Sequence, residues 1–276
     1  MAYEGYETLR VIASDGIARV TIDHPPINLF DLALMLELDR FSREVEADES
    51  VRVVVADSAD ADFFIAHADV SLILQLPREE RDTPNDELGF FHAMVDRFRT
   101  MPKATIAIVE GCVRGGGSEF VSSFDMRFAS LERAVFGQPE VPLGILPGGS
   151  GTQRLPALVG RARALEVILG GDDVDAATAD SWGWVNRALP DGELRPFVDA
   201  LATRIASFPA HAIAAAKASV NNAVVDPVPG LRQEELLFSQ CLLDPEAIRR
   251  MELCLALGGQ TREVEVRLPD LYSKLS

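Results

Sequence analysis

Alternating apolar and polar residues mark the start of the chain. Residues 8–14 and 17–23 alternate on either side of Asp15-Gly16, a dipeptide typical of a tight turn, so we expect a β-hairpin there. From Asp31 to Glu46 the apolar residues recur at helical spacing instead. Asp31 is suited to cap this helix, because its side chain can accept a hydrogen bond from a free backbone N–H group of the first turn.

Short apolar runs alternate with helical periodicity further along. Runs typical of buried strands cover 51–56, 63–66, 104–109, 124–129 and 134–136. Helical periodicity covers 88–99, 152–158, 209–223, 231–243 and 245–257, and the pattern is almost wholly helical from Gly160 onward. Residues 77–87 are polar and lack periodicity, which predicts a mobile loop. The order of elements predicts an α/β fold with a helical C-terminal region.

Composition and charge narrow the function classes. The 276 residues are 47% hydrophobic and 25% charged, as in ordinary globular proteins, and no apolar run reaches the roughly 20 residues of a membrane span. The first ten residues do not resemble a secretory signal. A net charge of −17 argues against nucleic-acid binding, although a small anionic ligand stays possible. Cys112, Cys241 and Cys254 lack metal-ligand or C-x-x-C spacing, which favours reduced thiols in a cytoplasmic protein.

Most familiar catalytic motifs are missing from the sequence. It contains no phosphate-binding P-loop, no G-x-S-x-G nucleophile motif and no dinucleotide-binding fingerprint. The four histidines are scattered in a way that predicts no zinc site. Two glycine-rich segments, 111–119 and 147–151, remain, and glycines between a strand and a helix indicate close approach of the backbone to a neighbouring group.

Two glutamates near these segments are candidates for acid–base chemistry. Glu119 follows the glycine triplet and is expected near the start of a helix, where the helix dipole would keep it ionised as a base. Glu140 lies in an apolar run, where desolvation would raise its pKa toward proton donation. Two carboxyl groups shifted in opposite directions would form an acid–base pair. The alternative is that Glu119 is an ordinary helix residue and Glu140 an ordinary loop residue.

Three segments together resemble the crotonase (enoyl-CoA hydratase/isomerase) superfamily. They are 64–69 (FIAHAD), 111–119 (GCVRGGGSE) and 136–155 (FGQPEVPLGILPGGSGTQRL), and their order and spacing also match. The resemblance covers roughly residues 8–225. It implies a spiral of ββα turns over residues 1–205 and a C-terminal helical trimerisation region over residues 206–276.

The resemblance also assigns site residues. Ala68 and Gly116 match the two residues whose backbone N–H groups form the oxyanion hole for the thioester carbonyl. Glu119 and Glu140 match the two acids of true hydratases, with Glu119 activating water and Glu140 handling the C2 proton. Coenzyme A and substrate binding are expected from the segment around Ala68, namely Ala66, His67, Asp69 and Val70.

The function implied is addition of water to a 2-enoyl-CoA, giving a 3-hydroxyacyl-CoA. No metal or redox cofactor is expected, coenzyme A enters only as part of the substrate, and the assembly is expected to be a homotrimer or homohexamer in the cytoplasm. The alternatives are double-bond isomerisation, thioester hydrolysis, or a non-catalytic relative that binds coenzyme A or RNA. The presence of both acids favours the hydratase, and the net negative charge argues against RNA.

Two departures from the family pattern stand out. His67 replaces the usual glycine, so either a positive φ angle strains it or its ring lies at the rim of the pocket. We expect the second case, with the ring partly exposed and the N–H of Ala68 pointing inward. The tail from Met251 lacks the phenylalanine- and lysine-rich ending that helps relatives to bind the phosphates of coenzyme A.

Overall fold

Two β-sheets form the centre of the molecule. The computed structural model describes residues 3–275. The larger sheet has the order β1-β2-β3-β5-β7-β10 and is parallel except for the β1–β2 hairpin, which confirms the predicted turn at Asp15-Gly16. The smaller sheet has the order β4-β6-β8-β9, with β8 and β9 antiparallel. The strands are β1 (Leu9–Ser14), β2 (Ile17–Ile22), β3 (Val53–Ser58), β4 (Phe63–Ile65), β5 (Ala104–Val109), β6 (Cys112–Arg114), β7 (Met126–Ser130), β8 (Val135–Gly137), β9 (Val174–Asp175) and β10 (Arg187–Leu189).

From β3 to β8, consecutive strands alternate between the two sheets. β3, β5 and β7 belong to the larger sheet, and the strand that follows each of them, β4, β6 and β8, belongs to the smaller one. A helical segment follows each pair before the chain returns to the larger sheet. Each turn of the chain therefore contributes one strand to each sheet, which confirms the α/β class and the predicted spiral of ββα turns.

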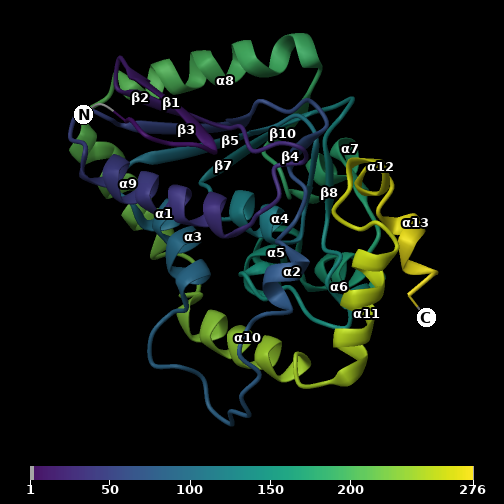
Figure 1. Cartoon of the computed structure of the whole chain (residues 1–276). Helices are drawn as coiled ribbons and strands as arrows, with labels where there is room; N and C mark the ends of the chain where they lie inside the picture. Colours follow the sequence, from purple (N-terminus) through teal and green to yellow (C-terminus); the bar gives the residue numbers. More distant parts are fainter. Residues whose placement is uncertain (1–2, 276) are drawn as a thin grey trace.

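Helices cover both faces of the larger sheet. In β3, Val53 and Val55 pack against α8 (Asp191–Ala206), whereas Val54 packs on the opposite side with buried residues of α1 (Leu32–Ala47). Figure 1 shows α8 on one side of this sheet and α1 on the other. Both faces are buried, as expected of a parallel sheet, and this explains why the strand reads as a continuous apolar run. The predicted cap Asp31 accepts a hydrogen bond of 3.0 Å from the backbone of α1.

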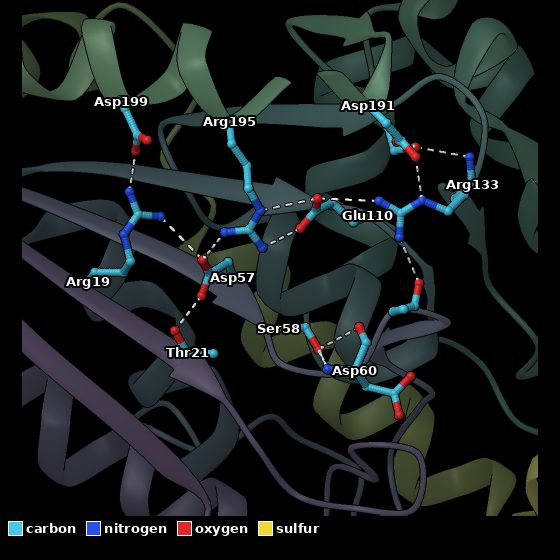
Figure 2. A network of polar contacts seen from close by, with 12 residues as sticks. Arg19, Thr21, Asp57, Ser58, Asp60, Glu110, Arg133, Asp191, Arg195 and Asp199 are labelled. Atoms are coloured by element: carbon cyan, nitrogen blue, oxygen red, sulfur yellow. Dashed lines mark hydrogen bonds and ion pairs between the residues drawn. The ribbon is translucent and has the colours of Figure 1, made fainter. Parts of the chain in front are cut away.

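Ion pairs fix α8 to the strand ends (Figure 2). The Asp57 carboxylate accepts from Arg195 of α8 at 2.8 Å and from Arg19 at 3.2 Å. Arg195 also pairs with Glu110, which receives a further contact from Arg133 at 3.3 Å. We refer to these five residues, with Asp191 and Asp199, as the α8 ion-pair network.

The remaining helices are α2 (Val70–Ile73), α3 (Phe90–Thr100), α4 (Gly115–Ser122), the 3₁₀ turn η1 (Val141–Leu143), α5 (Gly151–Val159), α6 (Arg161–Gly170), α7 (Ala176–Trp182), α9 (Ala210–Asn221), α10 (Val228–Cys241), α11 (Pro245–Ala256), α12 (Arg262–Glu265) and α13 (Pro269–Tyr272). Of these, α3, α5, α9, α10 and α11 confirm the predicted ones to within a few residues at their ends. Residues 77–87 form no helix or strand, in agreement with the predicted loop.

Three short strands were not predicted. β6 lies inside the glycine-rich segment, and β9 and β10 interrupt the region from Gly160 onward, whose other elements are helices, as expected. Strands of two or three residues are too short to show alternation, and neighbouring strands of the sheet determine them instead.

The C-terminal helices differ in how they pack. None of the residues of α9 is buried, whereas α11 and the tail contribute buried residues to a cluster that also contains Val70 and Leu143. Within residues 3–275, no helix has both the length and the apolar character needed to cross a membrane.

Candidate active site

Glu119 is held by the second glycine-rich segment. It lies in α4, directly after β6, with 3% of its surface exposed. Its Oε1 atom accepts hydrogen bonds from the backbone N–H groups of Gly149 and Gly151, at 2.8 and 2.7 Å. A Cβ atom on Gly149 would lie 2.5 Å from the other carboxyl oxygen of Glu119. Glycine at this position therefore lets the backbone approach the carboxyl group.

A third buried glutamate, Glu234 of α10, shares the same loop. It accepts hydrogen bonds from the N–H groups of Ser150 and Thr152, at 2.6 and 2.9 Å, and from the ring of His92 at 3.0 Å. Successive N–H groups of residues 149–152 thus point alternately to Glu119 and Glu234. Ser150 takes a φ of 110° to achieve this, a strained backbone conformation for a residue other than glycine.

The environment raises the pKa of Glu119. Burial is the largest cause and the charge of Glu234 the next, and together they outweigh the two backbone donors and bring the pKa to about 7. The expectation that a helix dipole would keep this group ionised is therefore wrong in its direction. Glu119 is the fifth residue of α4, beyond the first turn, where the dipole acts most strongly.

Glu140 is the second acid of the site and precedes η1. It is buried, and its Oε2 atom has no hydrogen-bond partner among residues 3–275. Burial, followed by the charge of Glu119, raises its pKa well above the ordinary value, as the apolar sequence around it predicted. The two carboxyl groups are shifted in the same direction, so the hypothesis of opposite shifts is wrong. They differ instead in hydrogen bonding, because Glu119 accepts from two N–H groups of the loop 147–151, whereas Glu140 has only its own backbone N–H as a donor.

The loop at Ala68 and the start of α4 approach each other closely. Phe30 holds the loop, since its N–H donates to His67 O at 2.9 Å and its carbonyl accepts from Asp69 N at 3.2 Å. In extended backbone the intervening N–H of Ala68 points to the opposite side. A Cβ on Gly116 would lie 3.5 Å from Ala68 N and 3.1 Å from its Cβ. The absence of a side chain at Gly116 brings the two backbones together.

A cavity of about 550 Å³ connects these groups. Ala68, Gly116, Glu119 and Glu140 all line it, and so does Asp69. Most of the remaining wall is apolar, from α1, α2, α3 and α10, and includes Leu32, Met35, Leu72, Phe91, Phe238 and Leu242. Arg81 of the loop 77–87 lines it as well and contacts Ser239 of α10 at 2.7 Å.

The other three predicted site residues do not line this cavity. Ala66 is buried in a small cluster with Ile27 and Phe63, and Val70 is buried against the C-terminal helices. His67 is only 6% exposed and its φ is not positive. The backbone at His67 is therefore unstrained, as expected, but the predicted place of the ring at the exposed rim is wrong, because the C-terminal tail covers it.

Sequence reasoning missed Glu234 and the partner of His67, which is Glu265. Glu234 lies on the buried face of α10, three residues after the buried Leu231. An acidic residue at an apolar position of a predicted helix was the available signal. Glu265 lies in a polar tail without periodicity and offered no such signal. Within the described part of the chain, no group of three or more His, Cys, Asp or Glu side chains could hold a metal ion.

Comparisons with known proteins identify the family of this chain. The family model described as enoyl-CoA hydratase/isomerase matches residues 13–246. A "Probable enoyl-CoA hydratase" from Rhizobium meliloti is 36% identical over 236 residues, 84% of this chain and 89% of that protein. A "Short-chain-enoyl-CoA hydratase" from Clostridium acetobutylicum is 33% identical over 235 residues, 84% of this chain and 88% of that one.

A solved structure is similar over nearly the whole chain. The crystal structure "of a putative enoyl-CoA hydratase" from Streptomyces avermitilis superimposes with a TM-score of 0.91 at 40% identity, covering 98% of this chain and 99% of that one. The similarity includes the C-terminal tail, which lies beyond the residues that the family model matches. With its ββα spiral, its two buried glutamates and these matches, the chain belongs to the enoyl-CoA hydratase/isomerase family.

Proposed function

We propose that this protein adds water across the 2,3 double bond of a 2-enoyl-CoA and releases a 3-hydroxyacyl-CoA. The observation that carries the proposal is one cavity lined by two buried carboxyl groups and by the Ala68 and Gly116 backbones. The relatives named enoyl-CoA hydratase support it. The apolar wall supports an acyl group that is a hydrocarbon chain.

In the proposed reaction, Glu119 takes a proton from water while the water oxygen bonds to C3. The electrons of the double bond move toward the thioester carbonyl, whose oxygen becomes an enolate oxygen. The N–H groups of Ala68 and Gly116 stabilise this charge, an interaction worth about 3 kcal/mol for each donor. Glu140 then delivers its proton to C2, and a proton returns from Glu119 to Glu140 before the next cycle.

The hydrogen bonds support this division of roles. Two backbone N–H groups stabilise the charged form of Glu119, so it is the more readily ionised group of the pair. Glu140 has an unpaired buried oxygen and a pKa well above the ordinary value, which favours the protonated form. Because the two groups interact, the apparent pKa values belong to the pair.

Substrate binding is proposed to use the segment Ala66–Val70 as the resemblance implies. Ala68 and Asp69 line the cavity, whereas Ala66, His67 and Val70 lie behind it and would support the loop. Coenzyme A takes part only as a piece of the substrate, and we propose that no metal or redox cofactor is needed, since hydration requires only proton transfers. Activity that survives dialysis against EDTA would agree with this.

The direct test is to incubate the protein with 2-enoyl-CoA thioesters of increasing acyl length. We expect loss of the enoyl absorbance and a product heavier by one water. A product of unchanged mass would indicate isomerisation, and free coenzyme A would indicate thioester hydrolysis. Either outcome, without hydration, would contradict the proposal. The alternative of RNA binding is disfavoured by the net charge of −17, and a salt-dependent shift assay tests it.

We further propose that the chain divides near residue 205 and assembles through its C-terminal helices as a homotrimer or homohexamer. Support comes from α9, which has no buried residue, and from Val220, Val224 and Val225 near its end, which are 67%, 60% and 91% exposed. Exposed apolar surface of this kind favours contact with another copy. Light scattering should give three or six times the mass of one chain. The three free cysteines agree with a cytoplasmic, reducing environment.

A further inference from the structure

The C-terminal tail of this chain contacts the Ala68 loop and the strands beside it. Gln260 donates to the Asp69 carboxylate at 2.9 Å, and Arg114 of β6 donates to the carbonyl of Glu265 at 2.9 Å. Arg262 pairs with Asp60 and with a second aspartate nearby. Glu265, at the end of α12, is 0% exposed. The tail is thus fixed at both sides of the loop.

His67 links the loop to the tail. Its Nδ1 atom lies 2.8 Å from the carbonyl oxygen of Ala68, and its Nε2 atom lies 3.0 Å from Oε1 of Glu265. The same Oε1 accepts the N–H of Gln260 at 2.8 Å. The carbonyl group of Ala68 is therefore held by the ring of His67. The N–H group of the same residue is the one proposed to bind the thioester oxygen.

The contacts of the His67 ring favour one protonation state. A carbonyl oxygen only accepts, so Nδ1 carries a proton and donates it to Ala68. One further proton lies between Nε2 and the carboxyl group of Glu265. An imidazole binds it more tightly than a carboxylate does. The expected state is therefore an imidazolium with both nitrogens donating, paired with a buried carboxylate.

The charged groups around the pair agree with this assignment. Burial lowers the pKa of His67, but the charge of Glu265 and the hydrogen bonds to Glu265 and Ala68 raise it overall. Burial raises the pKa of Glu265, but His67, the Gln260 N–H and Arg114 lower it overall. Arg114 opposes the charge on His67 and is itself paired with Asp173 at 2.6 Å. The other titratable groups that act on Glu265 or Arg114 are Cys112, Cys254 and Tyr272.

We propose that His67 and Glu265 are positioning residues for the oxyanion hole, and that the C-terminal tail of the same chain completes it. The glycine expected at position 67 has no side chain that could hold the Ala68 carbonyl. In this chain His67, in a buried ion pair with Glu265, holds it instead. The claim rests on the proposed acyl-CoA site, since it concerns how that site holds a thioester carbonyl. Small displacements of such donors reduce catalysis strongly.

The first test is the protonation of His67 in the protein without substrate. Nitrogen-15 spectra of histidine-labelled protein should show both ring nitrogens of His67 protonated at pH 7.5, with the signal assigned by its loss in H67N. In E265Q the ring should lose one proton at lower pH than in the wild type. A neutral ring at pH 7.5 in the wild type would overturn the proposal, and this measurement does not require a folded H67A.

The second test observes the thioester carbonyl without turnover. A saturated acyl-CoA labelled with carbon-13 at the carbonyl should show a lowered carbonyl stretching frequency when bound, because the hole polarises it. H67A should reduce this shift. H67N should recover most of it, since the asparagine amide can replace Nδ1 as donor to Ala68. E265Q should reduce it less than H67A. The matched control is E263Q, the exposed glutamate of α12.

Kinetics provide the third readout. We expect kcat to fall about 10-fold in H67A and less in H67N, with KM changed less than threefold, because the lost interaction acts in the transition state. Wild-type kcat and carbonyl frequency in a folded H67A would contradict the positioning role. A protein that binds and polarises the thioester without hydrating it would contradict the proposed function alone, and loss of that shift in H67A would still support the positioning role.

Discussion

Two groups of carboxylates in this molecule have opposite surroundings. In the α8 ion-pair network, Asp57, Glu110 and Asp191 each contact at least one arginine (Figure 2). At the cavity, Glu119 and Glu140 form no ion pair with arginine or lysine anywhere in residues 3–275. Hydrogen bonds from Arg133 and Ser130 lower the pKa of Asp191, whereas burial raises that of Glu119 to about 7.

The difference indicates which carboxylates stabilise the fold and which are suited to proton transfer. A carboxylate beside a guanidinium stays ionised over a wide pH range and fixes one element to another. A buried carboxyl group without such a partner exchanges protons near neutral pH, as proton transfer to and from a substrate requires. The same residue types thus fasten α8 to the sheet in one region and are left able to titrate in the other.

The largest expected effect is loss of activity at the cavity glutamates. E119Q and E140Q should each lower kcat by about 10² to 10⁴, because each removes a positioned acid or base. D57N, in the α8 ion-pair network, should leave kcat close to the wild-type value. The assay is hydration of a 2-enoyl-CoA by folded variants, and the double variant should lose far less than the product of the two single losses. Near-wild-type hydration in either single variant would remove that residue from the chemistry.

The pH dependence of kcat/KM should follow from the raised pKa of Glu119. The active form of the pair has one ionised and one protonated carboxyl group. The rate should therefore fall about tenfold for each pH unit below the apparent pKa near 7, and fall again at high pH once Glu140 loses its proton. A flat profile from pH 5 to 7 would show that ionisation of Glu119 does not limit the reaction.

The α8 ion-pair network should show its effect in stability. D57N should lower the free energy of unfolding by about 2 kcal/mol, since it leaves two arginines without their shared carboxylate. Urea denaturation at pH 7 measures this. Equal stability of D57N and wild type would mean that the network adds nothing to the fold.

An effect of opposite sign is expected at the cavity. The folded-state pKa of Glu119 lies above its unfolded value, so its contribution to stability is complete below about 4.5 and is lost as pH rises through about 7. E119Q keeps an oxygen that accepts the two backbone N–H groups and cannot ionise. It should therefore exceed the wild type in unfolding free energy by about 3 kcal/mol at pH 8, with little difference at pH 4.5. If E119Q were less stable than the wild type at pH 8, this would contradict the raised pKa of Glu119.

The sequence was informative where a pattern spans several residues or turns. The hairpin at Asp15-Gly16, the helix capped by Asp31 and the apolar strand at Val53 were predictable because local preference and burial agree there. The residues of β9 and β10 were not predictable, because two or three residues acquire strand geometry only from the strand beside them.

At the site, the sequence indicated the two acids and the glycines but not their environment. The raised pKa of Glu119 comes first from its burial in the folded chain and then from the charge of Glu234, which is 115 positions further along the chain. The burial of His67 likewise depends on Glu265, from a tail without any regular pattern. Long-range contacts of this kind leave no local signal, so charge states in the site could be read only from the folded chain.

The most direct test of the central claim is a titration of the glutamate side-chain carboxyl groups in the substrate-free protein by carbon-13 NMR. The signals of Glu119 and Glu140 can be assigned by their loss in E119Q and E140Q. The account predicts two carboxyl groups that titrate well above 4.5, one of them with an apparent pKa near 7, while the paired Glu246, bound by two arginines, titrates at about 2. Titration of both cavity glutamates at or below 4.5 would contradict the account.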